Sequence, residues 1–237
     1  MNACMIMNLT EAHAHGEAKC GRAVVSGSPA EISRLAASWP GPFSVGIHPW
    51  ATRDITFREI TDELASVERL ASLPEVVAVG EAGIDGLKGG DTELQAEILK
   101  EQVRISERVA KPLVLHVVRS GHIVMAVCRQ MERELHGLRQ PWIWHGFRGG
   151  PVEAARFLNL RNENYISLGL RFNAETARAV STARLLLETD DCGADIEHVV
   201  AEVAKSRGVA ADALREQVRA NLSRNITGSE TAWARDL

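Results

Sequence analysis

The sequence lacks a long apolar run. A membrane-spanning helix needs about 20 predominantly apolar residues, and every apolar run in these 237 residues is interrupted earlier by charge or proline. The first residues also lack the basic and then apolar pattern of a secretory leader. We therefore expect a cytoplasmic protein without a membrane segment.

Cysteine is scarce, and positive charge is not in excess. The four cysteines are scattered and make no C-x-x-C pair, which fits a reducing cytoplasm. Lysine plus arginine number 27 against 31 acidic residues, which gives a net charge of -4. No general basic surface for long nucleic acid is expected, so a polyanion would have to be bound locally.

The apolar content is sufficient for one large core. Hydrophobic residues make up 45% of the chain, and a chain of this length forms one domain without being forced to split. No linker or internal repeat interrupts it. We predict one domain over residues 1–228, followed by a loose tail at 229–237.

Short apolar runs rich in β-branched residues alternate with helical stretches. In residues 91–110, for example, apolar positions recur about every 3.6 residues, as in an amphipathic helix. Such alternation predicts a parallel sheet covered by helices. Eight repeats fit a closed (β/α)8 TIM-type barrel better than the alternative, an open doubly wound sheet. The predicted strands are 5–9, 22–26, 43–47, 76–79, 113–118, 142–144, 165–168 and 184–187.

The first repeat is unusually short. Six residues separate His15 from the predicted strand at 22–26, whereas a crossover with a helix usually needs about a dozen. The barrel is therefore expected to be irregular, with its first crossover helix missing.

Histidines and carboxylates recur where the predicted strands end. His13 and His15 are two residues apart, so on an extended chain their imidazoles point to the same side. In a barrel of this type, function lies at the carboxyl ends of the strands. The other ionisable residues at such ends include His48, Glu81, His116, His145, Glu188 and Asp190.

This combination favours a metal centre. Each residue has a structural alternative: His116 as a core histidine, for example, or Asp190 as a helix N-cap. Together, however, so many ionisable groups at strand ends are costly unless something pairs them. Four of these imidazoles and two of these carboxylates suit two divalent ions, with one carboxylate bridging and water completing the coordination. The six residues are His13, His15, Glu81, His116, His145 and Asp190.

Three further residues are candidates for substrate binding. Pro49 and Trp50 stiffen the loop of His48, which suggests a substrate contact rather than a metal ligand. Arg119 and Arg148 each follow a candidate histidine by three residues, and both could bind an anionic substrate as bidentate forks. The alternative for each arginine is a solvated loop position.

Several motifs, in this order, resemble those of the TatD-like metal-dependent hydrolases, also called TatD DNases, a branch of the amidohydrolase-like barrels. They cover most of the chain. The matching segments are "EAHAH" (11–15), "GIHPW" (46–50), "VGEAGID" (79–85), "QAEILKEQ" (95–102), "KPLVLHVVR" (111–119), "HGFRGG" (145–150), "LLLETDD" (185–191) and Asn221.

The resemblance implies a fold, a ligand set and an activity. It implies a (β/α)8-type barrel that hydrolyses nucleic-acid phosphodiesters with metal ions, often from a strand end. Asp190 would also orient or deprotonate the attacking water. By position, one ion would be held by His13, His15 and Asp190 and a second by His116 and His145, with Glu81 bridging.

Two departures from the family pattern concern the site. Glu11 stands where the family has aspartate, and one added methylene could change how it supports the two histidines. Cys192 follows Asp191 where the family has a proline soon after "ETD", so the loop over Asp190 is expected to take another path. A thiolate ligand is not called for by this chemistry.

The leading hypothesis is a two-metal phosphodiesterase or deoxyribonuclease acting on DNA ends or short oligonucleotides, with a monomer favoured. An alternative is a hydrolase of the same barrel type that cuts an amide, ester or lactone, since the same machinery serves other electrophiles. A third is a metal-binding scaffold without turnover, against which the complete ligand set argues. The histidines favour zinc or manganese, whereas the family resemblance favours magnesium.

Overall fold

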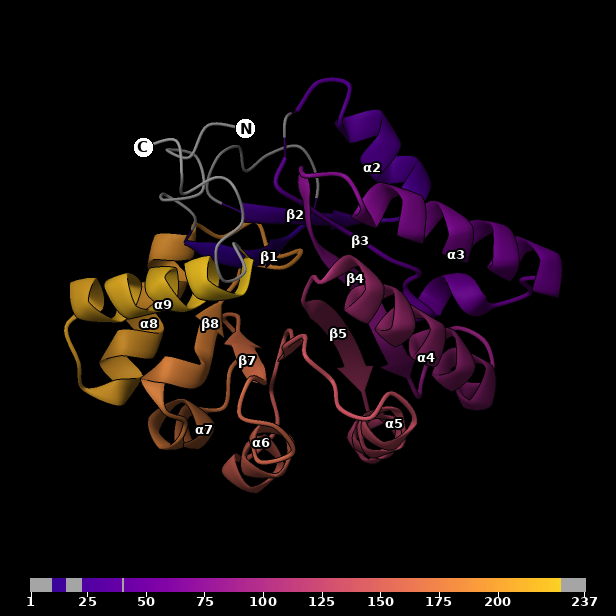
Figure 1. Ribbon diagram of the computed structural model, residues 1–237. Helices are drawn as coiled ribbons and strands as arrows, with labels where there is room; N and C mark the ends of the chain where they lie inside the picture. Colours follow the sequence, from indigo (N-terminus) through magenta and orange to yellow (C-terminus); the bar gives the residue numbers. More distant parts are fainter. Residues whose placement is uncertain (1–9, 16–22, 40, 227–237) are drawn as a thin grey trace. The chain divides into compact units, whose positions relative to one another are not determined.

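The computed structural model describes residues 10–15, 23–39 and 41–226 (Figure 1). Strands and helices alternate along them, and the fold is of the (β/α)8-barrel class, as predicted. The strands are β1 (Glu11–Ala14), β2 (Ala23–Gly27), β3 (Phe43–Val45), β4 (Val76–Asp85), β5 (Leu113–Val118), β6 (Trp142–Trp144), β7 (Tyr165–Leu168) and β8 (Leu185–Leu187).

The helices follow the strands along the chain. Within the described ranges, none is long and apolar enough to cross a lipid bilayer. The α-helices are α2 (Pro29–Leu35), α3 (Phe57–Ala71), α4 (Thr92–Val109), α5 (Gly121–Glu134), α6 (Pro151–Leu158), α7 (Ala174–Ala179), α8 (Ile196–Arg207) and α9 (Ala211–Ile226), and the 3-10 helices are η1 (Pro49–Thr52) and η2 (Thr182–Arg184).

Some predicted boundaries fall outside the described residues. The predicted strand at 5–9, the predicted loss of a helix after His15 and the tail at 229–237 all concern such segments. The first described strand is β1, which begins at Glu11, so His13 lies within a strand rather than after one.

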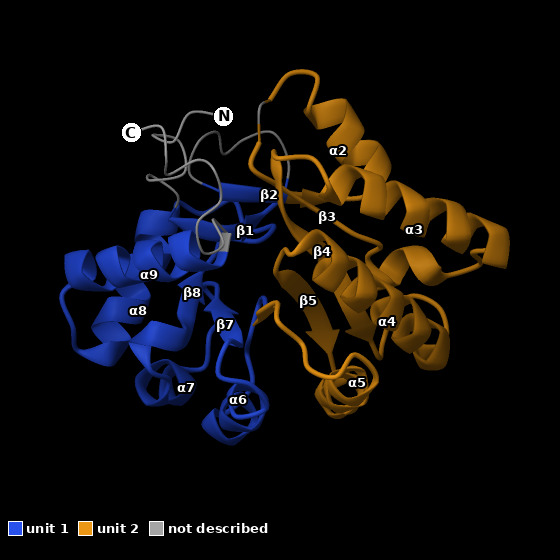
Figure 2. Cartoon of the chain, viewed as in Figure 1, with its two compact units in different colours: residues 1–25, 144–237 blue, residues 26–143 orange. Residues whose placement is uncertain are grey.

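Two compact units divide the chain (Figure 2). Unit 1 comprises residues 1–25 and 144–237, and unit 2 comprises residues 26–143. The domain boundaries at 1–228 stay a prediction.

In unit 2, strands β3, β4 and β5 are parallel neighbours. All ten residues of β4 are buried, and the strand carries Glu81. Its glycines permit close approach to β5: a Cβ on Gly83, where φ is +143°, would lie 2.0 Å from the carbonyl oxygen of His116. Any side chain at Gly83 would therefore push β4 away from the strand that carries His116.

In unit 1, β1 lies between β2 and the end of β8. Glu11 and Ala14 are in register with β2, and Ala14 makes an isolated parallel bridge with Asp190, just after β8. The Glu11 side chain accepts a 3.0 Å hydrogen bond from the Thr189 amide and another from the Thr189 hydroxyl. Although Glu11 departs from the family pattern, its carboxylate ties β1 to the segment that carries Asp190.

Local sequence signals explain several helix starts. Ser28 and Glu31 form a reciprocal capping box at the start of α2, and Thr56 and Glu59 form one at the start of α3. Asp91 caps α4 by accepting from the Glu93 amide. The first turns of these helices therefore have partners for otherwise unsatisfied amides.

Buried amide side chains hold the strand ends that carry polar residues. Gln102 of α4 accepts from the Ile47 amide at 2.8 Å and donates to the Ile47 carbonyl at 3.1 Å. Gln95, seven residues earlier in α4, accepts from the Asp85 amide at 2.7 Å and donates to the Asp85 carbonyl. Two glutamines of one helix thus fix the segments leading to His48 and out of β4.

Candidate active site

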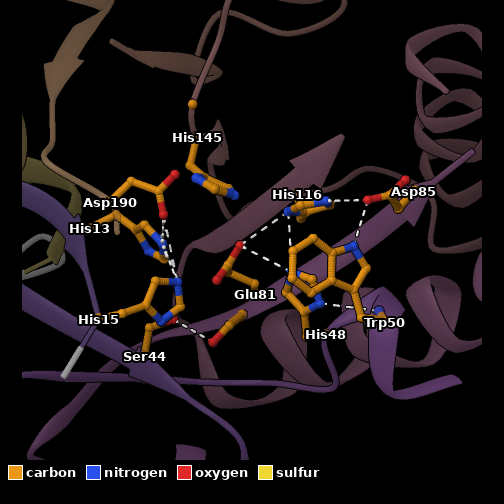
Figure 3. A network of polar contacts seen from close by, with 12 residues as sticks. His13, His15, Ser44, His48, Trp50, Glu81, Asp85, His116, His145 and Asp190 are labelled. Atoms are coloured by element: carbon orange, nitrogen blue, oxygen red, sulfur yellow. Dashed lines mark hydrogen bonds and ion pairs between the residues drawn. The ribbon is translucent and has the colours of Figure 1, made fainter. Parts of the chain in front are cut away.

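Three residues of unit 1 converge on one point. His13 and His15 bring their Nε2 atoms within 3.3 Å of each other, as their spacing predicts. Each Nε2 atom lies 3.7 Å from Oδ1 of Asp190 (Figure 3). The carboxylate comes from the end of β8 and the imidazoles from β1 and the residue after it, so the local meeting of these strands assembles the group.

His145 completes what we term the unit 1 cluster: His13, His15, His145 and Asp190. Its ring centroid lies 4.4 Å from that of His13, and ligand atoms of His13, His145 and Asp190 lie within 4.8 Å of one another. The His13 and His145 side chains are buried, whereas 41% of the His15 side chain is exposed. The cluster is therefore anchored in the core and reaches solvent at His15.

Glu188 supports His145 from inside unit 1. Its Oε1 lies 3.4 Å from Nδ1 of His145 and accepts a 2.5 Å hydrogen bond from the Gly146 amide. Burial raises the pKa of Glu188. His145 lowers it through a hydrogen bond and its charge, and His13 and Ser167 lower it further; together they outweigh burial, so the pKa lies below its usual value. An ionised Glu188 favours the tautomer of His145 with its proton on Nδ1, in which Nε2 carries the lone pair.

Unit 2 carries a second group, which we term the unit 2 cluster: His48, Glu81 and His116. Oε2 of Glu81 lies 3.4 Å from Nδ1 of His116 and 3.6 Å from Nε2 of His48. The two imidazole nitrogens are 3.2 Å apart, and the side chain of Glu81 is only 3% exposed. A buried carboxylate therefore faces two imidazoles (Figure 3).

Asp85 supports His116 as Glu188 supports His145. Its Oδ2 lies 3.1 Å from Nε2 of His116 and accepts a 2.6 Å hydrogen bond from the Trp50 indole. Burial raises the pKa of Asp85, but hydrogen bonds from Trp50, the Leu87 amide and His116 outweigh it, so the pKa lies below its usual value. The ionised carboxylate keeps a proton on Nε2 of His116 and turns Nδ1 toward Glu81.

His48 differs from His116 in the position of its proton. The Trp50 amide donates to Nδ1 of His48 at 3.1 Å, so the neutral ring carries its proton on Nε2. That nitrogen faces Glu81 and His116 and, with its proton in place, has no lone pair for a metal. The geometry supports a hydrogen-bond donor at His48, in keeping with the substrate contact expected from the sequence.

The donor atoms suit a divalent cation. Tetrahedral ligands about 2.1 Å from zinc lie about 3.4 Å apart, close to the 3.3 and 3.7 Å separations among His13, His15 and Asp190. Imidazole nitrogen with carboxylate oxygen is a donor set for zinc, manganese or iron. The described residues thus offer ligand groups of suitable type and spacing in unit 1, and the carboxylate and imidazole pair of Glu81 and His116 in unit 2.

A family comparison decides where the chain belongs. The family model described as TatD related DNase matches residues 11–227, which includes both clusters. The chain belongs to the TatD-related DNases. The resemblance inferred from the motifs is thereby confirmed, and the chain is a member of a family of metal-dependent hydrolases.

Individual relatives of this TatD-related protein carry hydrolase and nuclease names. The chain is 30% identical over 73% of its length to the uncharacterized metal-dependent hydrolase YjjV of Escherichia coli, of which 69% is covered. It is 29% identical over 68% of its length to the 3'-5' ssDNA/RNA exonuclease TatD of Citrobacter rodentium, of which 61% is covered. It is also similar, at 25% identity over 62% of its length, to a metal-dependent hydrolase of Buchnera aphidicola, of which the match spans 58%.

A solved structure supports the fold. The crystal structure of the YjjV TatD homologue of Escherichia coli matches with a TM-score of 0.74 and 21% identity, covering 94% of this chain and 100% of that one. At this identity the match supports only the fold of this TatD-related protein, in agreement with the alternating strands and helices.

Both predicted substrate arginines lie on exposed loops. Arg119 follows β5 in unit 2 with φ of +53°. Arg148 follows β6 in unit 1 and lines a cleft that also contains Asp190. Their roles in this TatD-related protein, like those of the predicted ligands, stay predictions.

Several residues of the site were not identified from the sequence. Glu188 was noted as a strand end but given no role, Asp85 was not singled out, and Trp50 was expected only to stiffen the loop of His48. For Asp85 a signal existed: it follows Glu81 by four residues within the "VGEAGID" motif, and in an extended segment, as β4 is, this spacing places both side chains on one side. The indole contact of Trp50 depends on the fold of η1, which no local pattern specifies.

Proposed function

We propose that this TatD-related protein is a two-metal phosphodiesterase that acts on nucleic-acid ends or short oligonucleotides. The observation that carries the proposal is the convergence of His13, His15 and Asp190 at ligand spacing. Relatives named deoxyribonuclease in Schizosaccharomyces pombe and ssDNA/RNA exonuclease in Citrobacter rodentium support the choice of substrate.

The proposed ligands come from both clusters. His13, His15 and Asp190 would hold one ion, as their spacing favours. His116 and His145 would hold the second, each through the ring nitrogen that does not face its buried carboxylate partner. Glu81 would contribute its carboxylate to both ions. Donor type favours zinc or manganese, with magnesium the further candidate.

The protein side chains supply binding and proton transfer. Bound divalent ions lower the pKa of water and neutralise charge on phosphoryl oxygens. Asp190, 24% exposed at its side chain, accepts the proton of the attacking water and orients that water. His48 donates its Nε2 proton in a hydrogen bond to a phosphate oxygen, and Arg119 and Arg148 bind anionic groups of the substrate.

The test combines metal analysis with cleavage of end-labelled single-stranded DNA. The parent should bind about two divalent ions per chain and release nucleotides, and Glu81→Gln and Asp190→Asn should each lower the rate by about a thousandfold. Asp62→Asn is the matched control, because Asp62 is 74% exposed on α3. The absence of cleavage with every divalent ion in a panel would contradict the proposal.

Hydrolysis of an amide, ester or lactone is the second candidate. The net charge of -4 favours an uncharged substrate over a polyanion. Bound metal without cleavage of DNA, RNA or phosphodiesters, combined with turnover of a lactone or amide that Asp190→Asn abolishes, would select this candidate instead.

A further inference from the structure

Unit 1 contains a cleft beside Asp190. Its volume is about 180 Å³, and its lining comes from the loops that follow β6, β7 and β8. Arg148 lies on the first of these loops, Arg171 on the second, and Asp190 and Asp191 on the third. Two cationic side chains thus line the same space as a residue proposed for hydrolysis.

Neither arginine is engaged by the rest of the described chain. Arg148 and Arg171 are exposed and make no hydrogen bond or ion pair with any residue that the structure describes. Two other arginines of unit 1 differ in this respect: Arg215 pairs with Glu197, and Arg184 donates to backbone carbonyls. As far as the described residues go, the guanidinium donors of Arg148 and Arg171 are therefore available to a ligand.

The acidic groups of the lining do not all oppose an anion. Glu188 is engaged with His145 and the Gly146 amide, and Asp190 lies against His13 and His15. Asp191, exposed at the edge, is the remaining acidic lining residue among those described. The two guanidinium groups therefore share the lining with one acidic residue, Asp191, that belongs neither to the unit 1 cluster nor to its support by Glu188.

Hydrogen bonds fix the backbone that carries Arg148. The Phe147 amide donates to the Ser167 carbonyl at 3.0 Å. On the other side of Arg148, the Thr176 hydroxyl of α7 donates to the Gly149 carbonyl at 2.7 Å. The buried hydroxyl of Thr176 thus ties the Arg148 loop to the helix that directly follows the Arg171 loop, so that little ordering is needed when a ligand binds.

We propose that Arg148 and Arg171 form a subsite for a second phosphate group of the substrate, adjacent to the phosphodiester that is hydrolysed. The inference rests on the proposed function and extends it to the class of substrate. Guanidinium forks match phosphate oxygens with paired hydrogen bonds. This subsite would give an acidic protein the local anion binding that a nucleic-acid end or short oligonucleotide requires.

The experiment compares three substrates: a dinucleotide without terminal phosphate, the same dinucleotide with a 5'- or 3'-terminal phosphate, and bis(p-nitrophenyl) phosphate. The parent should prefer one of the phosphorylated dinucleotides. Arg148→Gln and Arg171→Gln should each lower kcat/KM for that substrate by about tenfold, mainly through KM. Arg171→Gln, at a residue with no other role proposed, should leave hydrolysis of bis(p-nitrophenyl) phosphate within about twofold, because that substrate has no second phosphate.

Arg178→Gln is the matched control, since Arg178 is an exposed arginine of α7 outside the cleft lining. If the parent hydrolyses bis(p-nitrophenyl) phosphate but shows no preference for a terminal phosphate, or if Arg178→Gln loses as much as the cleft variants, the subsite is refuted while the phosphodiesterase proposal stands.

Failure of the proposed function has a separate signature: the parent hydrolyses none of the three substrates. In that case inorganic phosphate is titrated into the full chain by calorimetry. Phosphate binding that the double variant of Arg148 and Arg171 loses, and that Arg178→Gln keeps, supports an anion site. Equal binding by the parent and the double variant overturns it.

Discussion

The two units orient a histidine with the same device but expose opposite ring nitrogens. In unit 1, Glu188 lies against Nδ1 of His145, which favours the tautomer whose lone pair is on Nε2. In unit 2, Asp85 lies against Nε2 of His116, which favours the tautomer whose lone pair is on Nδ1, the nitrogen that faces Glu81 and His48. The position of the buried carboxylate thus decides which nitrogen a histidine offers.

The supports of the two carboxylates also differ. Glu188 is fully buried, and an amide in the same loop as His145 donates to it. Asp85 accepts from the indole of Trp50, whose residue is 49% exposed. The support of His116 therefore extends to a surface side chain, whereas that of His145 is enclosed in the core. We expect unit 2 to be the more sensitive to changes at the surface.

The largest effect should come from removing either oriented histidine. His116→Ala and His145→Ala each remove a proposed ligand, and we expect cleavage to fall by about a thousandfold in both. His122→Ala is the control, since His122 is an exposed residue of α5. Metal content is measured beside activity. If a variant keeps full metal content and full activity, the histidine that it lacks is not a metal ligand.

The next largest effect should come from the carboxylates. Asp85→Asn and Glu188→Gln keep the side-chain size but weaken the preference for one tautomer, and such changes lower metal affinity by about 10- to 100-fold. Dialysis against buffered zinc should show weaker binding of one ion in each variant. Unchanged affinity in both would show that these carboxylates only fill the core.

The sequence allowed the proposed metal ligands to be identified more readily than the residues that orient them. His13 and His15 could be identified because strand geometry fixes their relative direction within three residues. The opposite tautomers of His116 and His145 could not, since they depend on partners 31 and 43 residues away in the chain. Gln95 and Gln102 appeared in a family motif, but only the fold shows that they hold strand ends.

The boundaries show the same distinction between local and distant causes. The strands at 113–118, 142–144 and 165–168 were predicted as observed, because apolar runs bounded by polar turns define them. The strand at 76–79 was predicted too short: β4 continues to Asp85 through "GEAGID". Glycine and charge normally end a strand, but here neighbouring strands and Gln95 hold the segment extended.

A smaller effect should follow from the surface support of unit 2. Trp50→Phe removes the 2.6 Å hydrogen bond to Asp85 but keeps an aromatic ring. One hydrogen bond to a charged group is worth about 1.5 to 3 kcal/mol when buried, and less at a half-exposed residue, so we expect metal affinity to weaken by about three- to tenfold. Trp39→Phe, a substitution in the α2 to β3 connection, is the control. An effect as large as that of Asp85→Asn would show that Trp50 has a second role.

The smallest effect should appear as a difference in acid stability of the chelator-treated protein. The pKa of Glu188 is lowered on folding from an ordinary 4.5, and that of Asp85 from an ordinary 3.8. Below these ordinary values the unfolded chain binds more protons than the folded chain, so each carboxylate stabilises the fold above its ordinary pKa and loses that contribution as the pH falls through its folded pKa. Denaturant titrations should therefore show a shallower acid loss of unfolding free energy in Glu188→Gln, beginning near pH 4.5, and in Asp85→Asn, beginning lower. Acid profiles parallel to that of the parent would mean that the two carboxylates titrate alike in the folded and unfolded chains, and the tautomer argument would then lose its basis in both units.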